Sequence, residues 1–336
     1  MRLVVLGAGG LGSVIGGYLA EAGVDVTLIC RQAHADAINA NGLSIIGLRG
    51  EHLVNKNITA CATAEEAEGL FDYMMLAVKS KDTHTALSGA TSLIDRVDTF
   101  FSVQNNIVKE GQLADWCGDA TKVMGASTIE GGYLIAPGEV NNHMTVDCTA
   151  YFGELDGTIS PRVETITEAF NKAGLPTKAV TYIQQVLWEK LTQIANASTF
   201  AVSTLVGNTE LDFVHGLLVR EGAEHYVAIA RELLSVYTAQ GYEPQNFYAP
   251  ISRLKQIYAI KDNDEAVETM LGMGKQLQDR GYKGTTSMHD DVLRGRKTEA
   301  DDIIKPFIDK AAELGLEVPT ITACYRIIKV LDAYLK

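Results

Sequence analysis

Residues 1–31 read MRLVVLGAGGLGSVIGGYLAEAGVDVTLICR, and this stretch decides the fold of the N-terminal half. An apolar run at residues 2–6 leads into a glycine-rich turn, an apolar helical segment and a second apolar run at residues 24–30. Strand, glycine turn, helix and strand in this order are the context that a dinucleotide-binding fingerprint requires. The turn consists of Gly7, Ala8, Gly9, Gly10, Leu11 and Gly12.

The glycines of this turn have separate roles in such a site. Gly7 permits the tight turn, Gly9 lets the main chain approach a pyrophosphate, and Gly12 lets the helix pack closely on the sheet. The first N–H groups of the following helix have no partner within it, so they can bind a phosphate anion. We therefore predict a nucleotide site at residues 7–12. The alternative is a glycine-rich turn of an α/β domain that binds no ligand.

The end of the second apolar run indicates which nucleotide is preferred. Sites for NAD usually place Asp or Glu there to bind the ribose hydroxyls. This chain has Cys30 and Arg31 instead, and the next carboxylate is Asp36. A guanidinium pairs well with the oxygens of a 2′-phosphate, so we predict NADP(H) rather than NAD(H). The alternative for Arg31 is a solvated charge at the end of a strand.

Length and composition exclude several classes of protein. A chain of 336 residues suits two domains, and its net charge of −13 argues against binding to nucleic acid or to an anionic membrane surface. The cysteines are odd in number and lack metal-ligand spacing, so we expect reduced thiols, no metal site and a cytoplasmic location. The chain opens on a core strand and has no apolar run of transmembrane length, so we expect neither a signal peptide nor a membrane span.

The pattern of apolar residues divides the chain near residue 183. Before this point, short apolar runs alternate with helical patterns, which predicts a parallel sheet. The expected strands include 72–78, 98–103, 122–128 and 177–181, with a β-rich region at 132–152 and a capped helix from Pro161. After this point, long segments of helical period dominate. They cover residues 183–205, 215–240, 266–280, 301–314 and 321–335.

We therefore predict an α/β domain followed by an all-α domain. Residues 1–183 form a Rossmann-type nucleotide-binding domain, and residues 184–336 form a helical substrate domain. Ligands of open α/β sheets bind beyond the carboxyl ends of the strands. The active site is expected in a cleft between the two domains, where small-molecule sites often occur.

The chain resembles the ketopantoate reductases, also called 2-dehydropantoate 2-reductases, over nearly its whole length. The resemblance rests on an ordered set of motifs: Gly7 to Gly12, Arg31, Ala77-Val78-Lys79, Gln104-Asn105, Trp188-Glu189-Lys190-Leu191, Asn208, Ser287-Met288 and Thr298-Glu299. It implies a Rossmann-type domain, a helical domain, NADPH as the cofactor and a small 2-oxo acid as the substrate.

The resemblance assigns three further residues of the first domain. Lys79 follows an expected strand and matches a lysine beside the cofactor; the alternative is a surface lysine. Asn105 matches an asparagine that contacts both cofactor and substrate; the alternative is a cap for the next helix. Asn106 departs from the usual Asn-Gly of the family. Gly131 aligns with a small residue whose backbone meets the cofactor.

Lys190 is the main catalytic candidate. It lies in an otherwise apolar helical segment, VLWEKL, at the start of the second domain. Reduction of a ketone needs a proton on the carbonyl oxygen, and desolvation can lower the pKa of a lysine so that it becomes an effective acid. Its charge would also stabilise the developing alkoxide. The resemblance makes Lys190 the proton donor; the alternative is a lysine whose ammonium reaches solvent from an amphipathic helix.

The resemblance also places late residues in the site. Ser287 matches a serine that binds the substrate carboxylate, and Glu299 matches a catalytic carboxylate near the nicotinamide ribose. The alternative for Glu299 is an acid at a helix N-terminus. Asp291 matches a supporting acidic position, whereas we expect His289 and Asp290 to face solvent.

One departure concerns the substrate. The family commonly has asparagines four and eight positions after the catalytic lysine, where this chain has Ile194 and Ser198. Asn196 points to another face of the helix and is no simple substitute. Ser198 keeps a hydroxyl for the substrate, and Asn208 fits a further substrate-binding asparagine of the family. The reaction type is retained in this interpretation, and the identity of the acid stays open.

Three functions follow as alternatives. The first is an NADPH-dependent ketopantoate reductase. The second is a related reductase with a more apolar pocket, acting on another 2-oxo acid or related carbonyl. The third is a nucleotide-binding sensor without turnover, which the joint presence of Lys190, Ser287 and Glu299 opposes. The C-terminal helices are compatible either with a bundle within the domain or with the face of a homodimer.

Overall fold

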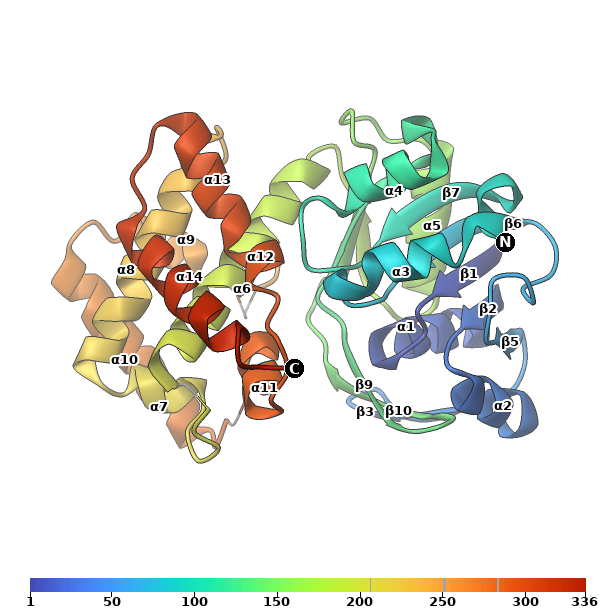
Figure 1. Cartoon of the computed structure of the whole chain (residues 1–336), viewed down its shortest axis with the longest axis horizontal. Helices are drawn as coiled ribbons and strands as arrows, with labels where there is room; N and C mark the ends of the chain where they lie inside the picture. Colours follow the sequence, from blue (N-terminus) through green and yellow to red (C-terminus); the bar gives the residue numbers. More distant parts are fainter. Residues whose placement is uncertain (206, 250–251, 283) are drawn as a thin grey trace. The chain divides into compact units, whose positions relative to one another are not determined.

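Figure 1 shows the computed structural model of the chain, which describes residues 1–205, 207–249, 252–282 and 284–336. The chain consists of two compact units, Met1–Leu187 and Trp188–Lys336. The division lies inside helix α6 (Ile183–Leu205), whose first residue is the boundary expected from the sequence. A single long helix therefore carries the chain from the first unit into the second.

A five-stranded parallel sheet is the centre of the first unit. Its order is β5-β2-β1-β6-β7, so the chain starts in the middle strand and the order reverses between β1 and β6. This is the Rossmann-type arrangement that the sequence predicted. The strands are β1 (Arg2–Leu6), β2 (Asp25–Ile29), β5 (Ile58–Cys61), β6 (Phe71–Leu76) and β7 (Val97–Ser102).

The strand side chains alternate between two cores, one on each face of the sheet. Leu3 and Val5 of β1 belong to the core that also contains apolar residues of α1 (Gly10–Glu21) and α5 (Pro161–Lys172). Val4 and Leu6 belong to the opposite core, beneath α3 (Thr83–Ser88) and α4 (Lys109–Cys117). Both faces are covered, which explains why these strands are apolar along their whole length.

A second sheet packs against α1. Two of its strands, β9 and β10, lie in the β-rich region expected at residues 132–152, whereas β3 and β4 were not predicted. Its order is β4-β3-β10-β9, and β10 pairs parallel with β3 and antiparallel with β9. A Cβ on Gly17 of α1 would lie 2.5 Å from Cδ1 of Ile45, so a larger residue there would displace the side chains of β3. Figure 1 shows the sheet beside α1. Its strands are β3 (Leu43–Gly47), β4 (Gly50–Val54), β9 (Gly131–Ala136) and β10 (Glu139–Met144).

A small third sheet has the order β12-β11-β8. The sequence suggested that residues 122–128 continue the parallel series, but β8 (Gly125–Thr128) pairs antiparallel with β11 (Ala150–Gly153). Only a single bridge, Phe100 to Val123, continues the parallel pairing beyond β7. β12 (Thr177–Ala179) completes this sheet.

The remaining helical elements of the first unit are short. Helix α5 begins as expected, with Ser160 as its cap and Pro161 at its first position. The others are α2 (Gln32–Asn41), η1 (Ser80–Asp82), η2 (Thr91–Arg96) and η3 (Ala120–Lys122).

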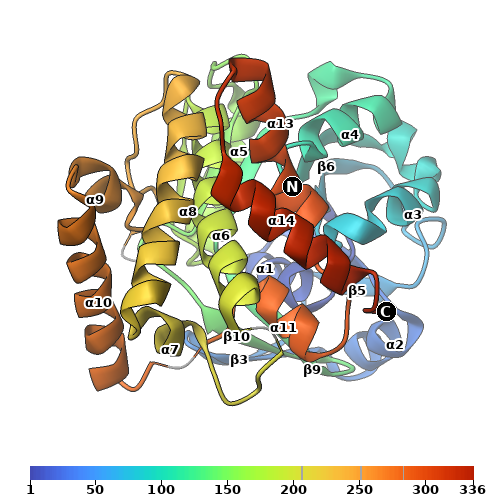
Figure 2. The same ribbon diagram turned by 60° about the vertical axis from the view of Figure 1, so that its left-hand side comes forward.

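In its described residues, the second unit contains helices and no strand. Helix α8 packs against α10, α13 and α14, and Figure 2 shows α8 and α10 side by side. The helices after α6 are α7 (Phe213–Leu217), α8 (Arg220–Ala239), α9 (Leu254–Ala259), α10 (Asn263–Asp279), α11 (Ser287–Leu293), α12 (Ala300–Ile303), α13 (Lys305–Leu314) and α14 (Pro319–Asp332).

Two of the expected long helices are interrupted. The segment 215–240 breaks at Val219, which is extended, and a Cβ on Gly222 would lie 2.0 Å from the carbonyl oxygen of Gly216. The segment 301–314 breaks at Ile304, just before Pro306 in the first turn of α13. Within the described ranges, no helix has the length and apolar character needed to cross a lipid bilayer.

Candidate functional site

The glycine-rich turn follows β1 at the carboxyl edge of the parallel sheet. Gly7 has a φ of +95°, and a Cβ there would lie 2.3 Å from Cγ1 of Val78, so both conformation and packing require glycine. The N–H groups of Gly7 and Ala8 donate to the carbonyl oxygen of Ile29, at 3.1 and 2.9 Å. The turn is thereby fixed to the ends of β2 and β6.

The start of α1 fits a pyrophosphate. The helix begins at Gly10, and its N-cap residue Gly9 has no side chain to accept from the first-turn N–H groups. A Cβ added to Gly9 would meet no protein atom within 4 Å. The main chain can therefore be approached at Gly9, and the N–H groups of Gly10, Leu11 and Gly12 point from the positive end of the helix dipole.

Arg31 is placed as the sequence suggested. It is the exposed N-cap residue of α2, directly after β2, and its side chain makes no capping hydrogen bond. The next carboxylate, Asp36, accepts a hydrogen bond from Gln32 at 2.8 Å. Burial raises the pKa of the neighbouring Cys30 to about 12, so its thiol stays neutral. This end of β2 therefore presents a cation, which suits an anionic group such as a ribose phosphate.

The loops after β6 and β7 are joined by buried amides. Gln104 donates through Nε2 to the carbonyl oxygen of Val78 at 3.0 Å and to the hydroxyl of Thr83 at 2.7 Å. Asn106 donates to Ser80 Oγ at 2.9 Å. These bonds hold together two loops that also carry candidate site residues.

Those candidates are Lys79, which is exposed, and Asn105, which is partly buried. The side chain that caps this turn is Asn106, whose Oδ1 accepts from the N–H of Val108 at 3.1 Å. Helix α4 begins after Val108 and has no side-chain cap, so the Asn106 bond stabilises the loop that leads to the helix. The sequence analysis named Gln104 and Asn106 but gave them no role in joining these loops, although their position after a strand was a usable signal.

Gly131 begins β9 and is buried. Its carbonyl oxygen accepts from Asn142 Nδ2 at 2.9 Å, and a Cβ there would lie 2.7 Å from Met144. The next residue, Gly132, contacts Gly10 of the glycine turn, since a Cβ on Gly132 would lie 2.7 Å from the Gly10 oxygen. This contact brings the second sheet to the start of α1.

In the second unit, Lys190 lies in α6 and is 6% exposed. Its neighbour Glu189 is 2% exposed and binds the loop after α8. The Glu189 carboxylate accepts from the N–H groups of Gln245 and Phe247, at 2.7 and 2.9 Å, and from the hydroxyl of Tyr237 at 3.1 Å. Burial raises the pKa of Glu189, and these hydrogen bonds oppose that rise. The backbone that carries Lys190 is thus firmly anchored.

Ile194 and Ser198 lie one and two helical turns after Lys190 in α6. Ile194 is partly buried and Ser198 is 2% exposed. Asn196 is fully buried beside Tyr226 of α8, where burial raises the pKa of the tyrosine to about 12. Asn196 therefore belongs to the packing between helices, on a different face from Lys190 and Ile194.

Three further candidates stand at the ends of helices. Asn208 is exposed just after α6, and its Oδ1 accepts from the N–H of Glu210 at 2.9 Å. Ser287 is the exposed first residue of α11, whose cap is Thr286. Glu299 is 8% exposed at the N-cap position of α12 but makes no side-chain capping bond. Its position is also the one expected of an acid at a helix N-terminus.

The expectation for His289 was wrong. Its side chain is fully buried in α11, and burial lowers its pKa, so the imidazole is neutral. The apolar face of this short helix, which includes Met288 and Val292, carries His289 into the interior. Asp291 is also buried, at 1% exposure. Among the residues that the structure describes, no cluster of His, Cys, Asp and Glu could hold a metal ion.

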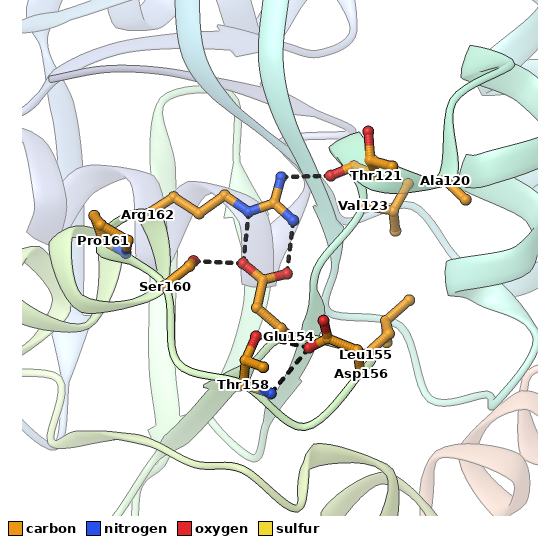
Figure 3. A pocket seen from close by; sticks show the side chains of 10 residues that line it. All are labelled: Ala120, Thr121, Val123, Glu154, Leu155, Asp156, Thr158, Ser160, Pro161 and Arg162. Carbon is orange, nitrogen blue, oxygen red and sulfur yellow. Dashed lines mark hydrogen bonds and ion pairs between the residues drawn. The ribbon is translucent and has the colours of Figure 1, made fainter.

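A hollow of about 590 Å³ lies elsewhere in the first unit, between η3 and the start of α5 (Figure 3). Its floor is an ion pair in which Arg162 donates to both oxygens of Glu154, at 2.7 and 2.6 Å. Asp156 binds the N–H and hydroxyl of Thr158, at 2.9 and 2.7 Å. These polar groups satisfy one another, and no candidate site residue lines the hollow.

The fold and the glycine turn define a protein of the Rossmann dinucleotide-binding class with an added helical unit. Comparison with known proteins specifies the class further. The family described as "Ketopantoate reductase PanE/ApbA" matches residues 3–157, and "Ketopantoate reductase PanE/ApbA C terminal" matches residues 182–332. The chain belongs to the ketopantoate reductase family, whose members are nicotinamide-dependent oxidoreductases acting on CH–OH donors.

The chain is also similar to individual proteins in sequence or in fold. A 2-dehydropantoate 2-reductase of Pyrococcus abyssi is 28% identical, covering 99% of this chain and 98% of its own. The crystal structure of 2-dehydropantoate 2-reductase from Methylococcus capsulatus has a TM-score of 0.77 at 23% identity, covering 99% and 97% of the two chains. A ternary structure of D-mandelate dehydrogenase with NADH and anilino(oxo)acetate has a TM-score of 0.74 at 17% identity, covering 99% of each chain.

Proposed function

We propose that this chain reduces a 2-oxo acid to the 2-hydroxy acid with NADPH, and that ketopantoate is the first substrate to test. The observation that carries the proposal is Lys190, a lysine 6% exposed on an anchored helix of a family member. Lysine is seldom buried to this extent unless it is paired or functional, and the family resemblance assigns the proton-donor role to this position.

The proposed reaction transfers one hydride and one proton to the substrate carbonyl. Bound NADPH supplies the hydride that reaches C2 of the oxo acid. Lys190 gives its proton to the carbonyl oxygen, so the alkoxide becomes a hydroxyl and the lysine is re-protonated from solvent. Asn105, Ser198, Asn208 and Ser287 orient the substrate, and Glu299 orients the nicotinamide ribose and the lysine. These roles come from the family resemblance.

The first unit supplies the other cofactor contacts in this proposal. Gly7 to Gly12 bind the pyrophosphate through main-chain N–H groups, and Gly131 lies against the cofactor through its main chain. Lys79 and Asn105 contact the cofactor from the loops that Gln104 and Asn106 join. Arg31, exposed at the end of β2, binds the 2′-phosphate. A relative of similar fold was studied with NADH, so the preference for NADPH needs a direct test.

A second candidate function is favoured by Ile194. This partly buried residue lies one helical turn beyond Lys190, where an amide is common in the family. An apolar side chain there suits a 2-oxo acid with a branched or aromatic side chain better than one with a hydroxyl. The protein in this case is a reductase of a different 2-oxo acid, with the same lysine as proton donor.

One assay tests the proposal and separates the two candidates. The oxidation of NADPH is followed with ketopantoate, with 2-oxoisovalerate and with phenylglyoxylate, and kcat/KM is compared. Highest efficiency with ketopantoate supports the first function, and highest efficiency with either apolar acid supports the second. Cofactor binding without turnover of any 2-oxo acid would refute both and leave a nucleotide-binding sensor.

A further inference from the structure

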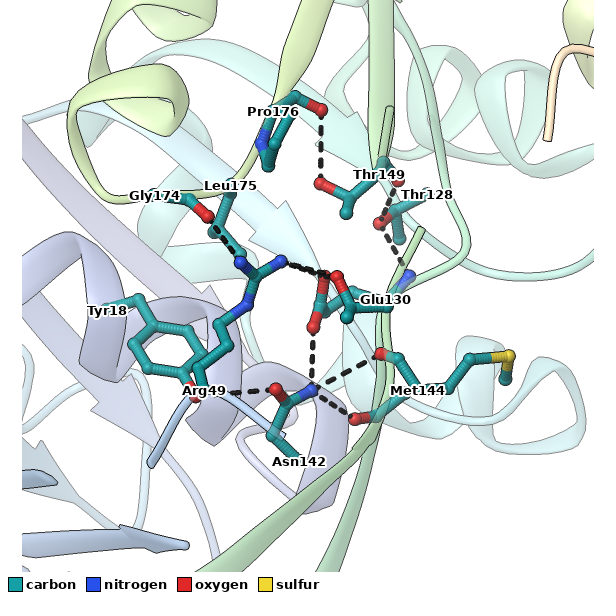
Figure 4. Close-up of polar contacts among 12 residues, drawn as sticks. Tyr18, Arg49, Thr128, Glu130, Asn142, Met144, Thr149, Gly174, Leu175 and Pro176 are labelled. Carbon is teal, nitrogen blue, oxygen red and sulfur yellow. Dashed lines mark hydrogen bonds and ion pairs between the residues drawn. The ribbon is translucent and has the colours of Figure 1, made fainter. Parts of the chain in front are cut away.

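Glu130 is a buried carboxylate that neither the sequence analysis nor the proposed function uses. Its side chain is 1% exposed, and it precedes the glycines that begin β9. Figure 4 shows it at the centre of a polar cluster formed by several separate segments of the first unit. A carboxylate in the interior needs full pairing to be retained.

Both oxygens of Glu130 accept hydrogen bonds. Asn142 Nδ2 donates to Oε1 at 2.6 Å. Arg49 donates to Oε2 at 3.1 Å and also binds the hydroxyl of Thr145 at 2.6 Å. The same guanidinium donates to the carbonyl oxygen of Gly174 at 2.6 Å. Glu130 therefore ties β10, the β3–β4 turn and the segment after α5 to the start of β9.

The cluster reaches α1 at two places. Tyr18, in the second half of α1, donates to Asn142 Oδ1 at 3.4 Å, and its ring lies 5.8 Å below the guanidinium of Arg49. At the other end of the helix, Gly10 faces Gly132. A Cβ on Gly10 would lie 2.4 Å from the Gly132 oxygen, so the two main chains are in direct contact.

We propose that Glu130 is a positioning residue for dinucleotide binding, acting through Gly132 on the phosphate-binding start of α1. The carboxylate fixes the path of residues 130–132 because Asn142 binds both its oxygen and the carbonyl oxygen of Gly131, at 2.6 and 2.9 Å. Gly132 in turn sets the position of Gly10, whose N–H belongs to the pyrophosphate site. The inference rests on the proposed function, since it assumes that this turn binds a nicotinamide dinucleotide.

The substitution Glu130→Gln tests the carboxylate without changing its size. Both oxygens accept from donors, so one donor must face the new amide N–H₂ whichever way the amide is turned. The matched control is Glu154→Gln, which disrupts another arginine-paired carboxylate of the same unit, at the hollow in Figure 3. Thermal unfolding of both variants measures the general loss of stability.

The substitution Gly132→Ala tests the contact itself and leaves the ion pair intact. Its Cβ would lie 2.7 Å from the Gly10 oxygen, so the turn must shift. The matched control is Gly111→Ala in α4, where a Cβ meets nothing within 4 Å. This pair of variants keeps the proposal testable if Glu130→Gln fails to fold.

Binding is measured by calorimetry with two probes. NADPH contains the pyrophosphate, whereas adenosine 2′-monophosphate has no 5′-phosphate and retains the 2′-phosphate that Arg31 would bind. We expect the Kd of NADPH to rise at least about tenfold in Glu130→Gln and Gly132→Ala, as displaced binding groups do. The Kd of adenosine 2′-monophosphate should change less than about twofold, as should both constants in the two controls.

Two results would overturn the inference. In the first, the variants bind NADPH as the parent does. In the second, both probes weaken alike, which shows that Glu130 only supports the domain in general. A parent that binds neither NADPH nor NADH refutes the proposed function as well, and this outcome is distinguishable because it appears before any substitution is made.

Discussion

His34 of α2 donates a hydrogen bond from Nε2 to Ser13 Oγ of α1, over 3.0 Å. The tautomer follows from the other ring nitrogen, because Nδ1 accepts from the N–H of Gly138 at 2.8 Å. The Ser13 hydroxyl in turn donates to the carbonyl oxygen of Ala8 in the glycine turn, at 3.1 Å. Burial and the charge of Arg31 lower the pKa of His34, which keeps the imidazole neutral.

This arrangement predicts a loss of stability in mild acid. Because the pKa of His34 is lower in the folded than in the unfolded chain, the unfolded chain takes up a proton below about pH 6.5 that the folded chain does not. The contribution of His34 to the free energy of unfolding is fully present above that pH. It decreases as the pH falls toward the pKa of His34 in the folded chain. Burial lowers the pKa values of His143, His225 and His289 too, so they act in the same direction.

The substitution His34→Asn isolates the contribution of His34. Its Oδ1 can still accept from Gly138 but does not titrate in this range. We expect the difference in Tm between pH 7.5 and pH 5.5, two conditions on either side of about 6.5, to be smaller in the variant than in the parent. Equal differences in the two proteins would contradict the assignment.

Arg31→Ala should weaken NADPH binding selectively. A lost charge-assisted contact with the 2′-phosphate costs roughly 1.5–3 kcal/mol, which corresponds to about 10- to 100-fold in KM. The KM of NADH, which has no 2′-phosphate, should hardly change. Lys56 is an exposed lysine of the same unit, so Lys56→Ala is the control for loss of a positive charge. A parent with equal efficiency for both cofactors would show that Arg31 does not set the preference.

Lys190→Ala should lower kcat by about 10² or more, the usual scale of general acid catalysis. Binding of NADPH, measured by calorimetry, should stay near the parent value, because the proposed contacts to the pyrophosphate and the 2′-phosphate lie in the first unit and do not involve Lys190. Lys255→Ala removes an exposed lysine of α9 and serves as the control. Turnover of Lys190→Ala at the parent rate would rule out this lysine as the proton donor.

Ile194→Asn should shift selectivity toward ketopantoate. The new amide would lie one turn beyond Lys190 and could bind the hydroxyl of this substrate, which is worth roughly 1–2 kcal/mol. The measurement is the ratio of kcat/KM for ketopantoate and 2-oxoisovalerate in parent and variant. If the parent already prefers ketopantoate strongly and the variant gains nothing, Ser198 or Asn208 supplies the contact instead.

Short-range patterns were sufficient for much of the fold. The glycine turn, the helix of α1 and the strands β1, β2, β6 and β7 lie where periodicity and turn residues predicted them. The long segment of α6 has the predicted limits, residues 183 and 205. These elements are encoded locally, since apolar period, glycine and proline act over a few residues along the chain.

The interruption of expected helices and the burial of polar side chains depend on contacts between residues that are distant in the sequence. The segment 215–240 has one helical period, yet the close approach of Gly216 and Gly222 divides it. His289 lies beside two aspartates and was expected in solvent, but the packing of α11 buries it. A single sequence gives no signal for such packing, because local polarity does not report which face of a short helix is covered.

The candidate residues and their order can be read along the chain: a glycine turn, an arginine after the second strand, and a lysine in an apolar helix. The buried polar groups that support these residues become visible once the sheets and helices are assembled. Glu130 pairs with Arg49, which is distant in the sequence, and Gln104 joins loops that follow two different strands. Their role arises because a buried charge or amide must find donors and acceptors wherever the fold brings them, and only the assembled sheets define those partners.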